Sequence, residues 1–488
     1  MALKSNSIDD ENFLQRVRPP DWKNPKPRNP YDLIIVGGGP AGLVAAEFAA
    51  RQGRRVALVE RYHLGGNSMN SGSIPSKAII RAARILTSLR DEEEYGAVAF
   101  ERPAADFRAV MARMRRIRTR IAEYHSVERL CAQGIDVFFD DARFVGRRAL
   151  LAGGTQLSFK KALIATGARP QPSNIPGLAQ IGYLTSDSIF DLDELPKRLG
   201  VIGGGPLGCE LAQAFCRLGS SVTLVQNEPK FLPNDDRDAA EILSMSLSRD
   251  GVETRLNTAV TGARLDGGAK LLDTVNNGVN YSIAVDEVLL SIGRVPNVED
   301  LGLEAAGIHF EAIGGIAVDA FLKTSNKHVY AAGDVCYSDQ FTNVAEASGR
   351  LAVRNMFGAG IERQSHWAIP WCTYCDPEIA HIGLHVHEAR RQSIPVKSFT
   401  VMMQDVDRAI TDGQDDGFVK IHVREGSDEI LGATVVASRA SELINEISVI
   451  MSAGIGLRRL AGILHTYPAQ SDAIRLAAMA YLNDQPPA

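Results

Sequence analysis

The stretch Tyr31-Asp32-Leu33-Ile34-Ile35-Val36-Gly37-Gly38-Gly39-Pro40-Ala41-Gly42 decides the fold of this chain. It joins a short apolar strand, a glycine turn and the start of an apolar helix, which is the opening of a parallel βαβ unit. The same pattern returns as Leu199-Gly200-Val201-Ile202-Gly203-Gly204-Gly205-Pro206-Leu207-Gly208. Each copy closes with a β-rich strand followed by Gly and Pro, at residues 162–170 and 288–296. We therefore predict an α/β fold with two Rossmann-like dinucleotide-binding domains, the second inserted into the first.

The 488 residues are too many for a single core, so several domains are expected. We place an N-terminal arm at residues 1–30 and the second dinucleotide domain at residues 186–292. The first dinucleotide domain then comprises residues 31–185 and 293–364. From residue 365 the pattern changes to alternating strands followed by helices, which predicts a C-terminal α+β domain at residues 365–488.

The composition limits the classes of binding partner and the cellular compartment that we expect for this chain. A net charge of −5 gives no reason to expect nucleic acid or an anionic membrane as a partner. No apolar run reaches the roughly 20 residues that span a bilayer. Six cysteines in so long a chain do not form a disulfide scaffold, which fits a reducing cytoplasm.

Both glycine turns predict a bound dinucleotide. In the first, Gly37, Gly39 and Gly42 allow a tight turn and close approach of a pyrophosphate, and Glu60 ends the next strand, where its carboxylate can accept from a ribose 2′-hydroxyl. In the second, the corresponding position is Gln226, which is neither the acid that favours NADH nor an arginine that favours NADPH. We expect this second site to bind NADH, and binding of both NADH and NADPH stays open. The remaining residues assigned to this second nucleotide are Gly203, Gly205, Gly208, Val260 and Gly293.

A second motif precedes a long amphipathic helix: Gly65-Gly66-Asn67-Ser68-Met69-Asn70-Ser71-Gly72-Ser73-Ile74-Pro75-Ser76-Lys77. With the two glycine turns, it resembles the pyridine nucleotide-disulfide oxidoreductases, in the branch of mercuric reductase and dihydrolipoamide dehydrogenase. In that family Ser68 and Ser73 would both be cysteines, whose disulfide relays electrons from the flavin to the substrate. A hydroxyl forms neither a disulfide nor a thiolate at neutral pH, so the resemblance implies that this relay is absent. Ser73 also has the position of a helix N-cap, and capping explains it better than catalysis.

The resemblance implies roles for further residues. The first site would hold FAD, with Asp334 bonded to the ribityl chain and a helix beginning near Thr342 facing the flavin pyrimidine. The ammonium of Lys77 would lie near the flavin N5, held by the carboxylate of Glu210. The backbone of three further residues would line the adenosine half of the site: Ala142, Thr166 and Gly167.

The segment His465-Thr466-Tyr467-Pro468-Ala469-Gln470-Ser471-Asp472 lies where many of these enzymes carry an acid–base histidine, contributed across a dimer interface. Here that position is Tyr467. A tyrosine with a pKa of about 10 is a poor proton shuttle at neutral pH but a serviceable donor. The resemblance therefore implies a homodimer, and we expect His465 to be exposed or packed.

Three other patterns are interpreted as structural. Cys372 and Cys375 form a CxxC, but on a strand these side chains face opposite sides about 10 Å apart, so neither a disulfide nor a metal site is expected. The arginines of residues 113–120 alternate with an apolar stripe, which predicts a solvated amphipathic helix. Without carboxylate or cysteine partners in metal spacing, three histidines are expected at the surface: His381, His385 and His387.

These observations predict an FAD-dependent NAD(P)H oxidoreductase that passes electrons from the reduced flavin directly to a small non-disulfide acceptor. Two alternatives stay open. One is a soluble pyridine nucleotide transhydrogenase, which Tyr467 favours, and the other is a non-catalytic flavin-bound partner or sensor.

Overall fold

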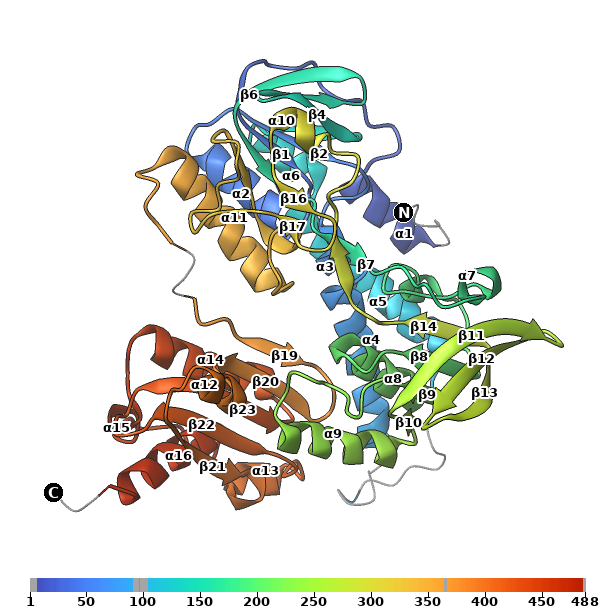
Figure 1. Ribbon diagram of the computed structural model, residues 1–488, viewed down its shortest axis with the longest axis vertical. Helices are drawn as coiled ribbons and strands as arrows, with labels where there is room; N and C mark the ends of the chain where they lie inside the picture. The colour runs from blue at the N-terminus through green and yellow to red at the C-terminus, as the bar shows by residue number, and fades with distance from the viewer. Residues whose placement is uncertain (1–6, 91–95, 97–103, 364–366, 486–488) are drawn as a thin grey trace.

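The computed structural model describes residues 7–90, 96, 104–363 and 367–485, which form three lobes (Figure 1). The first lobe is built on a sheet of seven described strands in the order β3-β2-β1-β6-β5-β4, with β18 paired to β6. Its parallel strands are β1 (Tyr31–Val36), β2 (Val56–Glu60), β3 (Asp136–Phe139), β6 (Thr155–Ile164) and β18 (Val329–Ala331), and its antiparallel strands are β4 (Ala142–Gly146) and β5 (Ala149–Ala152).

The register of this sheet brings the ends of its parallel strands to one edge. Val36 at the end of β1 lies opposite both Val59 of β2 and Ile164 of β6, and Ile164 in turn lies opposite Ala331 of β18. The glycine turn follows β1 at this edge and leads into α2 (Pro40–Arg51). In open α/β sheets, ligands bind at the carboxyl ends of the strands.

The second lobe repeats this design. Its parallel sheet has the order β10-β9-β8-β14, and a three-stranded antiparallel sheet lies beside it (Figure 1). The parallel strands are β8 (Arg198–Ile202), β9 (Ser221–Val225), β10 (Glu253–Arg255) and β14 (Glu287–Leu290), and the antiparallel strands are β11 (Thr258–Asp266), β12 (Ala269–Asn276) and β13 (Val279–Val285). α8 (Pro206–Leu218) and α9 (Arg237–Asp250) follow β8 and β9. The chain passes between the lobes through β7 (Ala168–Pro170) and β15 (Arg294–Pro296), which pair antiparallel.

Close packing explains the third glycine of each turn. A Cβ on Gly42 would lie 1.9 Å from the carbonyl oxygen of Gly37, and one on Gly208 would lie 2.0 Å from that of Gly203. Neither distance is compatible with a side chain, so only glycine lets each helix begin this near its strand. The predicted α/β fold with two Rossmann-like units is confirmed.

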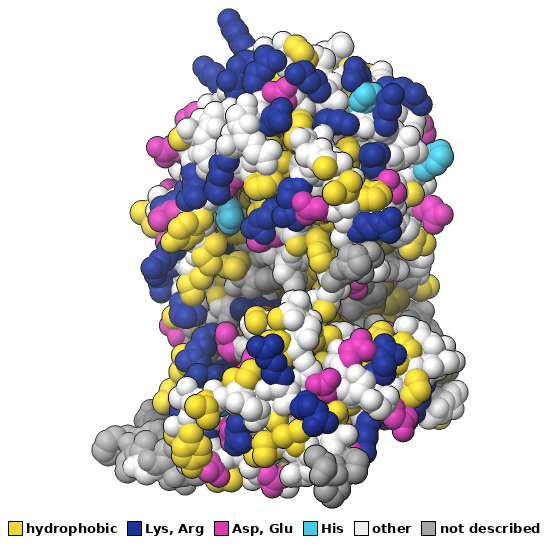
Figure 2. Space-filling model, turned by 90° about the vertical axis from the view of Figure 1, so that its left-hand side faces the viewer, with side chains coloured by type: hydrophobic (Ala, Val, Ile, Leu, Met, Phe, Trp, Pro, Cys, Tyr) yellow, Lys and Arg dark blue, Asp and Glu magenta, His cyan; other side chains and the backbone are white. Residues whose placement is uncertain are grey.

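The third lobe is an antiparallel sheet in the order β19-β20-β23-β22-β21, covered by helices, which is the predicted α+β arrangement. Its strands are β19 (Trp371–Thr373), β20 (Glu378–Gly383), β21 (Val396–Met402), β22 (Phe418–Arg424) and β23 (Ile430–Ala437). α14 (Ala440–Ser452) packs against β20 and β23, and α16 (Asp472–Asn483) packs against β21 and β22. On the face shown in Figure 2, basic side chains are interspersed with acidic ones. In the described part of the chain, no helix has the length and apolarity that a bilayer span requires.

The N-terminal arm is more than a surface arm. Residues Ile8–Val17 form α1, whose Phe13 and Val17 are fully buried. α1 packs on α5 (Phe107–Ala122), the helix that we expected to present its arginines to solvent. That expectation is wrong for Arg118, which is buried and donates to Asp10 at 2.9 Å. The acidic partner lies on a distant segment, which local periodicity does not reveal.

The surface prediction is also wrong for two of the three histidines. His381 and His385 are buried and their rings stack at 3.5 Å, whereas His387 is exposed as predicted. Burial lowers the pKa of His381 to about 3. His385 Nδ1 lies 3.2 Å from Asp236 Oδ1 at the start of α9, so the stack connects the third lobe to the second. Across the described ranges, no cluster of three or more His, Cys, Asp or Glu side chains is arranged to hold a metal ion.

The CxxC cysteines belong to different cores. Cys372 lies on β19 and packs against the core of the third lobe, whereas Cys375 lies beyond the end of that strand, in the core that contains α8. Both thiols are free. The two side chains diverge because the strand ends between them, rather than because both lie on it.

Candidate active site

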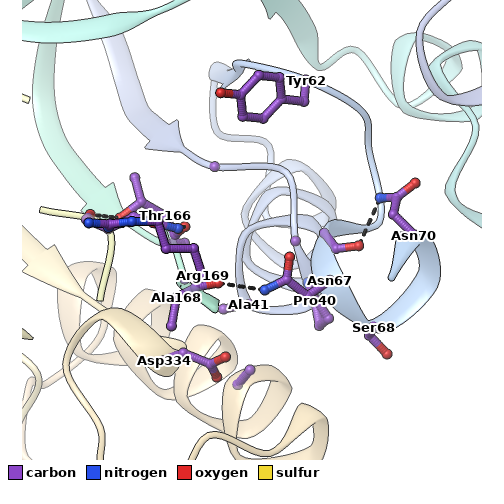
Figure 3. Close-up of a pocket in the computed structure, with 18 of the residues that line it drawn as sticks. Pro40, Ala41, Tyr62, Asn67, Ser68, Asn70, Thr166, Ala168, Arg169 and Asp334 are labelled. Atoms are coloured by element: carbon purple, nitrogen blue, oxygen red, sulfur yellow. Dashed lines mark hydrogen bonds between the residues drawn. The ribbon is translucent and has the colours of Figure 1, made fainter. Parts of the chain in front are cut away.

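A cavity of about 680 Å³ opens at the strand-end edge of the first sheet (Figure 3). The glycine turn, the loop after β2, α3 (Gly66–Asn70) and the start of α11 (Thr342–Phe357) surround it. Ten of the residues predicted for the first site line it: Gly37, Gly39, Glu60, Ser68, Ser73, Ala142, Thr166, Gly167, Asp334 and Thr342. Gly42 lies just beyond the lining, at its packing contact with Gly37.

Glu60 is held in place by two backbone groups. Its Oε2 accepts the N–H of Gly38 at 2.6 Å and its Oε1 accepts the N–H of Tyr62 at 2.6 Å. Burial raises the pKa of this carboxyl. At the next turn, α2 begins after Gly39 with no side-chain cap among the described residues, so its first N–H groups remain available to an anion. An acidic anchor beside an uncapped helix N-terminus fits the ribose and pyrophosphate of a dinucleotide.

The opposite wall carries the predicted contacts to the rest of the cofactor. Asp334 pairs with Arg294 at 3.1 Å, and burial raises the pKa of its carboxyl. Thr166 donates through its hydroxyl to the carbonyl of Asn297 at 2.7 Å, and its own carbonyl accepts from the Asn297 side-chain amide at 2.8 Å. Arg294 and Asn297 both line the cavity and were not predicted. They lie where the chain returns to the first lobe; the closing pattern at residues 288–296 includes Arg294 but indicates only the end of a strand, not a contact with the cofactor.

The serine motif folds as the short helix α3 followed by the first residues of a long helix, α4 (Ser73–Arg90). Ser68 lies on α3, and Thr342 Oγ1, at the start of α11, donates to its hydroxyl at 3.2 Å. Ser71 donates to Asp187 at 2.9 Å, which ties the motif to the segment before the second lobe. Asn67 donates to the carbonyl of Ala168 at 2.5 Å (Figure 3).

Ser73 does not cap its helix. α4 (Ser73–Arg90) begins at Ser73 itself, and the first helical bond runs from the N–H of Ser76 to the carbonyl of Gly72. Gly72 therefore takes the N-cap position that we predicted for Ser73. The Ser73 hydroxyl is exposed on the cavity wall, with no hydrogen-bond partner among the described residues.

Lys77 and Glu210 form the predicted pair. Lys77 Nζ lies 2.8 Å from Glu210 Oε2, and the two side chains come from α4 and α8. Neither residue belongs to the cavity lining, although Lys77 is one helical turn beyond Ser73, on the same face of α4. Tyr374 completes the arrangement: its N–H donates to Glu210 Oε1 at 2.9 Å, and its ring centre lies 4.3 Å from Lys77 Nζ. Tyr374 was not predicted, because a cation–π contact between residues so far apart in sequence leaves no local pattern.

The second glycine turn reproduces the first with an amide in place of the acid. Gln226 Oε1 accepts the N–H of Gly204 at 2.8 Å, as Glu60 does for Gly38. α8 begins after Gly205 with no side-chain cap among the described residues, and a Cβ on Gly205 would meet open space. These features again fit a dinucleotide. Two more of the predicted residues, Val260 on β11 and Gly293 before β15, lie outside the cavity lining.

Tyr467 lies on the third lobe and outside the cavity lining of its own chain. It is 71% exposed and donates to Asp407 Oδ2 at 2.8 Å, a bond that raises the pKa of its phenol. His465 is packed, with its Nε2 2.7 Å from Glu446. The chain alone thus leaves Tyr467 facing solvent.

No cysteine contributes to the cavity in the part of the chain that the structure describes. Burial raises the pKa of each of Cys209, Cys336, Cys372 and Cys375. Such thiols are protonated at neutral pH and chemically inert.

Comparison with known proteins adds the family. The family described as pyridine nucleotide-disulphide oxidoreductase matches residues 31–350, and its dimerisation domain matches residues 369–478. The chain belongs to this family. It is 31% identical to a mercuric reductase of Staphylococcus aureus over 93% of this chain and 83% of the relative. It is 33% identical to a dihydrolipoyl dehydrogenase of Thermus scotoductus, over 92% of this chain and 97% of the relative.

Solved structures agree with this assignment. The HOCl-induced flavoprotein disulfide reductase RclA from Escherichia coli, as its Cu(II) complex, superposes with a TM-score of 0.83 at 27% identity, covering 93% of this chain and 99% of that one. LpdA from Mycobacterium tuberculosis superposes with a TM-score of 0.84 at 28% identity, covering 92% of this chain and 99% of that one. The cofactors of the family are FAD and NADH or NADPH, and the two uncapped helix N-termini described above fit them.

Proposed function

We propose that this protein is an FAD-dependent NAD(P)H oxidoreductase that delivers electrons to a small non-disulfide acceptor. One observation carries the proposal. In the motif that resembles the redox-active segment of the family, Ser68 and Ser73 occupy the two cysteine positions. None of the described residues that line the cavity carries a sulfur atom that could take the place of the missing cysteines. Hydroxyls at both positions leave no dithiol stage between cofactor and acceptor.

Bound FAD would supply the redox chemistry, which is acceptance of a hydride from NADH or NADPH and delivery of two electrons to the acceptor. With a quinone as the acceptor the balance is NAD(P)H + H⁺ + quinone → NAD(P)⁺ + hydroquinone. Glu60 and the start of α2 bind the cofactor, with Asp334 on the opposite wall. Glu210 and Tyr374 hold the Lys77 ammonium in one position, where it offers a positive charge and a proton beside the reaction.

The proposal also includes the oligomeric state of the protein. The chain forms a homodimer through the dimerisation domain at residues 369–478, and Tyr467 serves the cavity of the partner subunit as a proton donor. Its exposure in the single chain, together with the 98% exposure of Leu464, supports this arrangement. We retain the domain boundaries given above, with the second nucleotide bound by residues 186–292.

Transhydrogenation between nicotinamides is the second candidate. Gln226 favours it, because an amide beside the ribose carries no charge to select between NAD and NADP. A protein of that kind would take a hydride from one nucleotide and return it to the other, with no further acceptor.

Steady-state turnover distinguishes these functions. The purified holoprotein is mixed with NADH or NADPH and, in separate reactions, with a soluble quinone, a thionicotinamide dinucleotide or an oxidised disulfide. We expect quinone-dependent oxidation of the nucleotide and no reduction of the disulfide. Reduction of the thionicotinamide dinucleotide in place of the quinone would favour transhydrogenation, and disulfide reduction would overturn the proposal. A flavin band that neither nucleotide bleaches would favour a non-catalytic role.

A further inference from the structure

The segment before the first glycine turn is attached to the cavity wall. Residues 7–28 precede residue 31, where the match to the family begins, and α1 within them packs on α5 (Figure 1). We call residues 7–28 the N-terminal strap. Its contacts reach three stretches of chain that line the cavity: the loop after β2, α3 and the end of β3.

The first contact is with the loop that follows Glu60. Arg18 Nη1 donates to the carbonyls of Arg61 and Tyr62, the latter at 2.8 Å. The carbonyl of Val17 accepts the N–H of Leu64 at 3.1 Å. Arg61 and Tyr62 line the cavity next to the carboxylate that is predicted to bind the ribose. The strap therefore fixes the backbone of this loop on the side away from the ligand.

The second contact is with α3. Arg118 of α5 donates to Asp10 Oδ1 at 2.9 Å, and the two side chains are 2% and 4% exposed. The Arg118 guanidinium also lies 4.7 Å from the ring centre of Phe13, and its Nη1 donates to the carbonyl of Asn70 at 3.4 Å. Asn70 ends α3 and lines the cavity. A buried cation held by α1 is thus bonded directly to the turn that carries Ser68.

The third contact is with the end of β3. Asn24 Oδ1 accepts the N–H of Phe139 at 2.9 Å, and Trp22 packs edge-on against the Phe139 ring at 5.9 Å. The next residue, Asp140, lines the cavity and donates its N–H to the carbonyl of Glu60 at 2.9 Å. The loop after Glu60, α3 and the end of β3 are therefore all braced by the same segment.

We propose that the N-terminal strap sets the affinity of the cavity for FAD, with Arg18 as its principal positioning residue. A loop ordered before the ligand arrives does not have to be ordered on binding, so preorganisation increases affinity. The proposal rests on the flavin site alone and is independent of which acceptor the enzyme uses.

The test compares two Arg→Ala variants on one segment. Arg18→Ala removes both bonds to the loop, whereas Arg16→Ala removes only the surface pair with Glu123, at 2.8 Å and away from the cavity. Apoprotein is titrated with FAD by flavin fluorescence, and the melting temperature of each apoprotein is measured alongside. We expect the dissociation constant of Arg18→Ala to rise at least about tenfold while Arg16→Ala matches the wild type. Equal dissociation constants for the two variants would overturn the proposal.

A variant that removes the charge but keeps a donor separates bracing from electrostatics. Arg18 also contributes a positive charge near Glu60. Nη1 alone donates to both carbonyls, and Arg18→Gln replaces it with a neutral amide nitrogen that can also donate two hydrogen bonds, so we expect its FAD dissociation constant to lie below that of Arg18→Ala. An Arg18→Gln variant that binds FAD as weakly as Arg18→Ala would assign the effect to charge and overturn the strap. A wild-type apoprotein that fails to bind FAD would instead overturn the proposed function.

Discussion

Removal of the charge on Glu210 tests whether its pair with Lys77 serves the reaction. Glu210 is 3% exposed and accepts from Lys77 at 2.8 Å and from the Tyr374 N–H at 2.9 Å. Glu210→Gln keeps an acceptor for the N–H and loses only the ion pair. A fully buried pair that loses one partner costs about 3–5 kcal/mol, and an exposed pair about 0–1 kcal/mol. Because the Lys77 side chain is 32% exposed, we place the loss between these limits, at about 1–3 kcal/mol.

If that energy holds the ammonium in its working position, the rate of flavin reduction should fall by about fivefold to about 160-fold, at about 1.36 kcal/mol per factor of ten. Anaerobic stopped-flow mixing with saturating NADH measures this rate from the bleaching of the flavin band. The matched control is Glu378→Gln. Glu378 also pairs with a cation, Arg84 at 3.0 Å, and accepts a backbone N–H, that of Ser441 at 2.9 Å, but it contacts neither Lys77 nor the cavity.

We expect Glu378→Gln to reduce its flavin within about twofold of the wild-type rate, because only stability depends on its pair. A Glu210→Gln variant as fast as the wild type, or a control slowed by the same factor, would refute the reasoning.

Three further outcomes follow from the structure. Gln226→Glu adds the carboxylate that selects a free ribose 2′-hydroxyl, so the ratio of kcat/KM for NADH to that for NADPH should rise by about tenfold or more in steady-state assays. The folded pKa of His381, about 3, lies below the unfolded value near 6.5, so the stability that it contributes is complete above pH 6.5 and is lost as the pH falls toward 3. Between pH 7 and pH 5, the free energy of unfolding of the wild type should therefore fall by about 2 kcal/mol more than that of His381→Asn, as measured by denaturant titrations. Asp10→Asn leaves Arg118 buried without a counter-charge and should cost about 3–5 kcal/mol of stability, whereas Glu123→Gln at the surface should cost about 1 kcal/mol or less, as compared by thermal melting.

The fold could be predicted because local patterns encode it. Gly42 and Gly208 stand where a side chain would collide with the preceding turn, so each glycine marks the junction of a strand and a helix. Glu60 and Gln226 end the next strands and reach back to the turns, a spacing that the sequence also displays. The helix expected from Thr342 begins there and continues to Phe357.

The errors arise where distant segments meet. Arg118 finds Asp10 across 108 positions of sequence, and His385 finds Asp236 across 149. Helical periodicity describes the face on which Arg118 lies but not the helix that covers that face. The position of Ser73 differs by one residue, because serine and glycine both serve as N-caps and only the hydrogen bonds show which one does.

The number of electrons that each flavin accepts tests the central claim most directly. Anaerobic titration of the holoprotein with dithionite, followed through the visible spectrum, counts these electrons for each FAD. Because serines occupy both motif positions, the protein should take up two electrons per FAD and show no long-wavelength thiolate-to-flavin absorbance. Uptake of four electrons per FAD, with that absorbance at the halfway point, would reveal a redox-active disulfide and contradict the account.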